Sequence, residues 1–234
     1  KTSVTAGMDP FPPTNSALSD PNGLLAVGGD LTPSRLLEAY RRGIFPWYEA
    51  GEPILWWTPS PRAVLFPDDF HESRSFKKFL KTCCWTVEFD RQFEHVVEAC
   101  AQPAKGRLDT WISDEMKRAY TELHRLGYAH SVEVMDQDQL VGGLYGVKLG
   151  SVFFGESMFS RSPNASKLAL RTLCNLGSAG RLTLIDCQMP NEHLQSLGMT
   201  MMTREAFEDV LRRGIGDFAD ASSMNAELGG ILSS

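Results

Sequence analysis

Apolar side chains recur at helical spacing early in the chain. Leu36, Leu37 and Tyr40 form one face of a predicted helix. Thr32 is a suitable N-cap for this helix, and Pro33 suits its first position. The pattern therefore predicts a short amphipathic helix, and the chain that follows is rich in proline and aromatic residues.

The middle of the chain has the pattern of a sheet. The segments HSVEVMD, QLVGGLYGV and SVFFGESM are separated by short polar turns, which predicts an antiparallel meander. A helix over ASKLALRTLCNLG and a strand over LTLIDCQ follow. This order favours an α+β fold with a mixed, mostly antiparallel sheet flanked by helices, rather than a regular βαβ alternation.

Repeated prolines mark a boundary near residue 61. Pro46, Pro53, Pro59 and Pro61 interrupt a stretch that also holds three tryptophans. We therefore expect a small N-terminal domain over residues 1–61 and a larger domain over residues 62–234.

Composition narrows the function classes. The chain has 234 residues, a net charge of −6 and five cysteines without CxxC spacing, which is typical of reduced cysteines in a cytoplasmic protein. No apolar run approaches the roughly 20 residues that a membrane helix needs, and the first residues show no secretory signal. An acidic protein that binds nucleic acid needs a local basic patch.

Such a patch is predicted in the segment HESRSFKKFLK. Four cations at i, i+3, i+4 and i+7 share one face of the predicted helix, namely Arg74, Lys77, Lys78 and Lys81. They could contact a phosphate backbone, or they could form an ordinary solvated face.

The segment LIDCQMPNEH holds the first candidate for chemistry. On a strand, Asp186 and Gln188 would point to one face and Cys187 to the other. Asp186 could then deprotonate a nucleophile that Gln188 orients, or it could cap the following turn. Cys187 with His193 is a much weaker candidate for a thiol nucleophile.

A second carboxylate and two tryptophans complete the candidates. Glu156 follows a very apolar strand and could hold a substrate cation in a cleft, or form a salt bridge to Arg161. Trp47 and Trp111 lie in polar or proline-rich loops, where they could stack on a base or pack at a domain junction.

Familiar catalytic motifs do not occur. The sequence has no GxSxG, P-loop or HExxH motif, and its five histidines show no metal-ligand spacing, so no metal is predicted. Residues 139–144 approach the Q/R-x-x-G-x-G/A loop of acetyl-CoA-dependent enzymes but depart from it at the last position. A coenzyme A site is therefore not expected.

Nine sequence blocks occur in order between about Pro21 and Gly198. They are PNGLLAVGGDL, RRGIFPWY, ILWWTPSPRAVL, TWIS, HSVEV, LVGGLYG, FFGESMFSR, NASK and LIDCQMPNEHLQSLG. In this combination the chain resembles the leucyl/phenylalanyl-tRNA–protein transferase family. The resemblance implies a small N-terminal domain, an acetyltransferase-like catalytic domain and no cofactor.

The resemblance also implies roles for single residues. Asp186 and Gln188 match the family's catalytic pair, and Glu156 matches the acid that meets the basic N-terminal residue of the acceptor. Trp47 and Trp111 match aromatics near the terminal adenosine. The remaining substrate-binding residues that the resemblance implies are Leu144, Phe153, Met158, Leu173, Ile185 and Asn191. Leu173 stands where a larger side chain is expected, which leaves the preference for Leu or Phe open.

The implied activity moves Leu or Phe, with Met as a further donor, from aminoacyl-tRNA to proteins that begin with Arg or Lys. The product carries an N-terminal degradation signal, and we expect a cytoplasmic monomer. Asp186 would accept a proton from the attacking amine, or the site would mainly position its substrates. A coenzyme A-dependent N-acyltransferase and a non-catalytic RNA-binding module are the alternatives.

Overall fold

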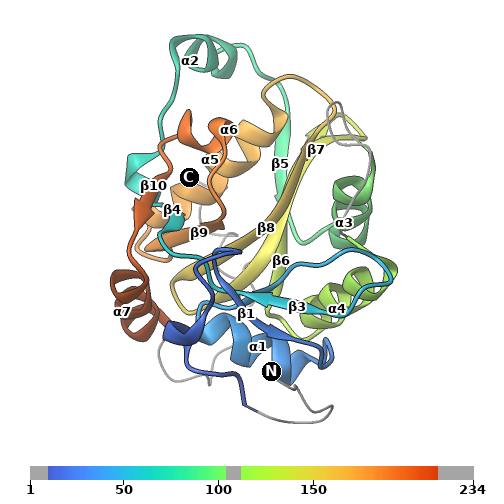
Figure 1. The fold of residues 1–234 in the computed structure, drawn as a ribbon. Helices are drawn as coiled ribbons and strands as arrows, with labels where there is room; N and C mark the ends of the chain where they lie inside the picture. Colours follow the sequence, from blue (N-terminus) through green and yellow to red (C-terminus); the bar gives the residue numbers. More distant parts are fainter. Residues whose placement is uncertain (1–9, 104–111, 216–234) are drawn as a thin grey trace.

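The computed structural model describes residues 10–103 and 112–215, and these residues form an α+β fold (Figure 1). Its helices are α1 (Pro33–Arg41), α2 (Arg74–Leu80), α3 (Phe93–Ala101), α4 (Asp114–Arg125), α5 (Ala165–Ser178), α6 (Glu192–Gln195) and α7 (Arg204–Ile215). Its strands are β1 (Leu24–Val27), β2 (Phe45–Pro46), β3 (Leu55–Trp57), β4 (Arg62–Leu65), β5 (Thr86–Phe89), β6 (Ala129–Asp136), β7 (Gln139–Leu149), β8 (Val152–Ser160), β9 (Leu184–Gln188) and β10 (Thr200–Met202).

A seven-stranded sheet carries the fold, in the order β10-β4-β9-β8-β7-β6-β5. Strands β8 and β9 pair in parallel, whereas the other neighbouring strands of this sheet pair antiparallel. The predicted α+β class and the predicted mixed, mostly antiparallel sheet are therefore confirmed.

Local signals explain several helix ends. Helix α1 begins at Pro33, and Gly43 after its end has a φ of 71°, a left-handed conformation that favours glycine. The hydroxyl of Ser73 caps α2 by accepting a hydrogen bond from the Phe76 amide, and Ser113 caps α4 in the same way.

Two groups of short strands were not predicted. Strands β1, β3 and β2 form a three-stranded sheet in the N-terminal region, where the sequence had indicated mainly proline-broken loops. Strand β10 adds an edge to the large sheet beside β4. Strands of two to four residues carry too little alternation to be read from one sequence.

Each face of the large sheet buries its own core. One core joins the N-terminal region to α3 and α4, with Tyr40, Trp56, Phe93 and Phe154 among its members. The other core lies under α5 and includes Leu173. The first core crosses the predicted boundary at residue 61, and the division into two domains stays a prediction.

The parallel pair β8 and β9 opens the large sheet at one point. Their pairing runs from Val152 with Leu184 to Phe154 with Asp186. Beyond it, β8 continues to Ser160 beside β7, while β9 ends at Gln188. Side chains from the two strand ends therefore face a shared gap.

Candidate active site

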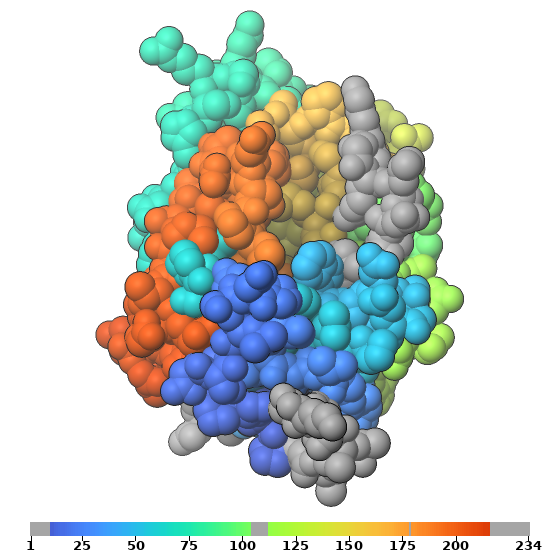
Figure 2. All heavy atoms as spheres, viewed as in Figure 1, coloured from blue at the N-terminus to red at the C-terminus, as the bar shows by residue number. Residues whose placement is uncertain are grey.

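A cavity of about 250 Å³ occupies this gap between β8 and β9. On the viewed face of the molecule, residues of the meander lie recessed beside those of the C-terminal half (Figure 2). Nine predicted site residues line the cavity: Leu144, Phe153, Glu156, Met158, Leu173, Ile185, Asp186, Gln188 and Asn191. The structure therefore brings residues that lie far apart in the sequence into one site, which has both apolar and polar walls.

Asp186 is fully buried and held by a guanidinium group. Its Oδ1 accepts a hydrogen bond from Arg62 Nε at 2.8 Å, and its Oδ2 accepts one from Arg62 Nη2 at 2.7 Å. Arg62 itself lies between two aromatic rings, with its Cζ 4.7 Å from the Phe45 centroid and 4.8 Å from the Phe207 centroid. The bidentate pair is well matched in shape and charge. It leaves Asp186 poorly placed to accept a proton from a substrate.

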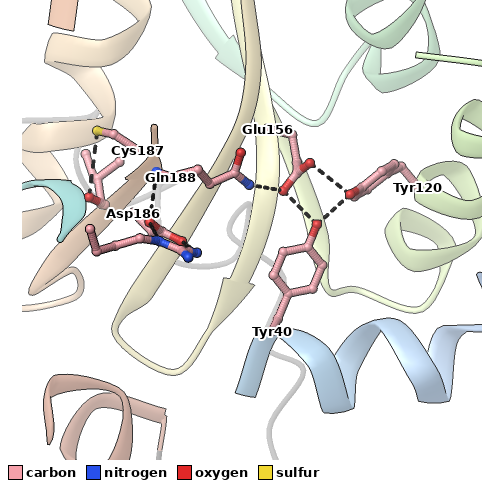
Figure 3. Close-up of polar contacts among 8 residues, drawn as sticks. Tyr40, Tyr120, Glu156, Asp186, Cys187 and Gln188 are labelled. Carbon is pink, nitrogen blue, oxygen red and sulfur yellow. Dashed lines mark hydrogen bonds and ion pairs between the residues drawn. The ribbon is translucent and has the colours of Figure 1, made fainter. Parts of the chain in front are cut away.

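Gln188 sits at the end of β9 in a left-handed conformation, with a φ of 63°. Its backbone amide donates to Asp186 Oδ1 at 2.9 Å, so the buried carboxylate holds this strained residue in place. The side-chain Nε2 of Gln188 donates to Glu156 Oε1 at 2.8 Å across the gap (Figure 3).

The predicted alternation at Asp186, Cys187 and Gln188 is confirmed. Cys187 packs against the core under α5, whereas Asp186 pairs with Arg62 and Gln188 bonds Glu156 on the opposite face of the sheet. The pairing of β4 with β9 shifts its register here, because Ala63 pairs with Gln188 and Val64 with Asp186. Asp186, Cys187 and Gln188 all line the cavity, which lies at the end of β9. Burial raises the pKa of the Cys187 thiol, which argues against a thiolate nucleophile.

Glu156 has three neutral partners. Its Oε1 lies 2.6 Å from the Tyr40 hydroxyl, its Oε2 lies 2.8 Å from the Tyr120 hydroxyl, and Gln188 is the third partner (Figure 3). Burial raises the pKa of Glu156 to about 7. The alternative of a salt bridge to Arg161 is wrong, because that guanidinium donates to the Leu140 carbonyl and lies over the Phe159 ring.

Trp47 is not part of the observed cavity. Trp47 is 42% exposed, and its ring centroid lies 5.9 Å from that of Trp57. Trp47 is not among the residues that line the cavity. Trp111 lies outside the described residues. A role for either ring against a base stays a prediction.

The basic helix forms as predicted, and α2 projects from the body of the molecule (Figures 1 and 2). All four of its predicted cations are exposed, whereas Phe76 on the opposite face is buried. Lys81 is the C-cap residue directly after the helix. The helix therefore presents a cationic face to solvent, and its binding to tRNA stays a prediction.

Three further residues of the site were missed. Tyr40 was predicted only as part of an apolar helix face, and neither Tyr120 nor Arg62 was predicted as a site residue. A usable signal was present, since buried tyrosine hydroxyls and buried carboxylates both need polar partners. This signal indicates that each of these groups has a polar partner, but it does not identify the partner.

Across residues 10–103 and 112–215, no group of three or more His, Cys, Asp or Glu side chains is arranged to hold a metal ion. Among the same residues, no helix combines the length and apolar character needed to cross a membrane.

An apolar cavity with an amide and a carboxylate at one end suits an enzyme that transfers an apolar acyl group. Comparison with protein families identifies the class of enzyme more specifically. Residues 64–212 match the family described as leucyl/phenylalanyl-tRNA protein transferase, and residues 29–60 match its N-terminal domain. The chain belongs to this family of aminoacyltransferases.

Relatives with the name leucyl/phenylalanyl-tRNA–protein transferase agree over most of their length. One from Pseudomonas syringae is 54% identical over 211 residues, which cover 90% of this chain and 92% of that protein. One from Azotobacter vinelandii is 56% identical over 201 residues, which cover 86% of this chain and 89% of that protein.

Solved structures give weaker likenesses. A GCN5-related N-acetyltransferase from Kribbella flavida matches with a TM-score of 0.39 and 12% identity, covering 73% of this chain and 61% of its own. An aminoglycoside acetyltransferase from a soil metagenome matches with a TM-score of 0.36 and 15% identity, covering 47% and 82%. Scores this low carry no argument, so the acetyltransferase-like architecture stays a prediction.

Proposed function

We propose that the chain transfers leucine or phenylalanine from the terminal adenosine of a charged tRNA to the α-amino group of a protein that begins with Arg or Lys. The observation that carries this proposal is the cavity between β8 and β9, which joins apolar walls to the polar cluster of Gln188 and Glu156. We place the activity in the cytoplasm, in a monomeric enzyme that marks its acceptors for degradation.

The apolar wall is suited to the side chain of the transferred residue. Leu144, Phe153, Leu170, Leu173 and Ile185 are all buried and line the cavity. An apolar side chain gains by leaving water for such a wall, whereas a polar one would lose its hydrogen bonds. This contrast supports selection of Leu and Phe among aminoacyl groups.

The transfer needs no external energy source, because the aminoacyl ester is already activated. The acceptor nitrogen forms a bond to the ester carbonyl carbon, and the bond from that carbon to the 3′-oxygen of adenosine breaks. The nitrogen loses one proton, and the leaving oxygen gains one.

Gln188 is suited to orienting the attacking amine. Its Nε2 donates to Glu156, which leaves its side-chain oxygen to accept a hydrogen bond from the amine. Asp186 then acts through Gln188 as an anchor, since it pairs with Arg62 and accepts from the Gln188 amide. This arrangement supports catalysis by positioning over general-base catalysis by Asp186.

The other contacts of the substrates follow from exposure and charge. Glu156 lies where a carboxylate could meet the cationic end of the acceptor. The exposed Trp47 ring offers a face to the terminal adenosine, and the cationic face of α2 offers phosphate contacts to the tRNA.

The test is transfer of radiolabelled leucine from charged tRNA to a peptide that begins with Arg. We expect labelling of this peptide, and none of the same peptide with an acetylated N-terminus. Gln188→Ala should lower kcat, while Cys84→Ala, a change at an exposed cysteine outside the cavity, should leave it unchanged. Transfer from acetyl-CoA, or tRNA binding without transfer, would contradict the proposal.

A further inference from the structure

Four oxygen atoms of Tyr40, Tyr120 and Glu156 form a closed set of contacts. The two tyrosine oxygens lie 2.5 Å apart. The Tyr40 oxygen lies 2.6 Å from Glu156 Oε1, and the Tyr120 oxygen lies 2.8 Å from Glu156 Oε2. All three distances are within hydrogen-bond range for oxygen pairs.

Counting hydrogens shows that the ionised form cannot fill this set. Each of the three contacts needs its own hydrogen atom, and the two tyrosine hydroxyls supply only two. If Glu156 were a carboxylate and both tyrosines donated to it, the two tyrosine oxygens would face each other at 2.5 Å with no hydrogen between them.

A neutral carboxylic acid supplies the missing hydrogen. The acid can donate from Oε2 to Tyr120, which donates to Tyr40, which donates back to Oε1; the ring can also run in the opposite direction. In both directions Oε1 can still accept from Gln188 Nε2. Every contact is then a proper hydrogen bond.

The surroundings also favour the neutral form. Glu156 is 8% exposed, and both tyrosines are fully buried. Tyr145 packs edge-on against Tyr120 with their ring centroids 5.6 Å apart, and it adds no positive charge. The nearby Asp186 carries a negative charge that disfavours a second carboxylate, while the Arg62 charge is already paired with Asp186.

We propose that Tyr40, Tyr120 and Glu156 share one proton in addition to the two tyrosine hydroxyl protons, so that Glu156 is a neutral acid in the site without substrate. Because the proposed acceptor brings a cation to this carboxyl, the proton is released to the solvent buffer when the cation binds; this second step rests on the proposed function. Glu156 thus becomes charged only once a partner for the charge has arrived.

The first step can be tested on the protein without any substrate. Carbon-13 NMR of protein labelled at the glutamate δ-carboxyls follows each glutamate through a pH titration, and Glu156→Gln identifies the Glu156 signal by its loss. If that variant does not fold, Tyr120→Phe identifies the same signal by its shift. Glu133→Gln, at another fully buried glutamate, is the matched control for this assignment and should leave the Glu156 signal in place.

We expect the Glu156 signal to titrate with a midpoint near pH 7, well above the value of about 4.5 for exposed glutamates. An infrared difference spectrum, wild type minus Glu156→Gln, should show a protonated carboxyl band at pH 6 that is lost by pH 8.5. A Glu156 midpoint at or below about 4.5 would overturn the shared proton. Neither experiment involves tRNA or peptide, so a failure here is distinct from a failure of the transfer reaction.

Discussion

The two carboxylates of the site, Asp186 and Glu156, are both buried but have opposite surroundings. A guanidinium group clamps Asp186 through two hydrogen bonds and matches its charge. The hydrogen-bond partners of Glu156 are all neutral, namely two phenols and an amide. A carboxylate therefore serves as a fixed counter-ion in one position and as a titratable group in the other. Burial favours the neutral form of Glu156, whereas Asp186 has a cationic partner that matches its charge.

The largest expected effect comes from removing the clamp. Arg62→Met should destabilise the fold by about 3–5 kcal/mol, because Asp186 would remain as an uncompensated buried charge. Urea unfolding measures this loss. Arg161→Met, at an arginine that stacks on Phe159 at the surface, should change stability by less than about 1 kcal/mol. A loss of similar size in both variants would mean that the Arg62 pair does not anchor the site.

Glu156 should give the fold an unusual pH dependence. Its pKa is about 7 in the folded protein and near the ordinary 4.5 in the unfolded chain, so the folded state binds more protons between these values. Stability contributed by the neutral form is full below about pH 4.5 and is lost as the pH rises through 7, by roughly 3 kcal/mol at most.

Unfolding free energies of wild type and Glu156→Gln, measured from pH 5 to pH 8, isolate this contribution. The glutamine variant should lose less stability over the range. Glu122→Gln, at a half-exposed glutamate of α4 that pairs with Arg125, should follow wild type. Parallel curves for wild type and Glu156→Gln would show that Glu156 is ionised throughout this pH range.

The sequence could predict most of the large elements of the fold. Strands β6, β7 and β8 have clear alternation and turns, and helices α2 and α4 have serine caps, so their patterns were readable. The lining of the cavity came from family resemblance, since no local pattern places Leu173 beside Ile185.

The hydrogen-bonded partners could not be predicted from spacing. Tyr40 and Glu156 are 116 residues apart, and Arg62 and Asp186 are 124 apart. Such pairs depend on how separate elements pack, which one sequence does not specify. The register shift at Gln188 is equally non-local, because it arises from the pairing of β9 with β4.

The apolar wall should respond differently from the carboxylates. Leu173→Ala enlarges the cavity, and we expect the ratio of kcat/KM for phenylalanine over leucine to rise by about 10-fold. Leu176 is a buried leucine of the same helix that does not line the cavity. Leu176→Ala should lower the free energy of unfolding about as much as Leu173→Ala does, without shifting the ratio of kcat/KM. An equal shift of the kcat/KM ratio in both variants would show that the effect comes from a less tightly packed core and not from the wall of the cavity.

The smallest expected effect concerns α2. Lys77→Ala combined with Lys78→Ala should weaken tRNA binding several-fold and flatten the log–log salt dependence by up to about two units, one for each lost phosphate contact. Activity with a minimal aminoacyl-adenosine donor should survive, because that donor lacks the distant backbone. Lys117→Ala combined with Arg125→Ala removes cations that are already paired with Glu98 and Glu122. This control variant should change neither the affinity for tRNA nor the salt dependence. An unchanged salt slope in the α2 variant would remove this helix from the tRNA contact.

The contrast between a fixed and a titratable carboxylate is tested most directly by the protons released when an acceptor peptide binds. Calorimetry at pH 7 in two buffers of different ionisation enthalpy gives the number of protons released by wild type, Glu156→Gln and Asp186→Asn. We predict that wild type releases about half a proton more than Glu156→Gln, while Asp186→Asn, where it still binds the peptide, keeps the wild-type excess. Equal proton release by wild type and Glu156→Gln, with the peptide bound by both, would contradict this account.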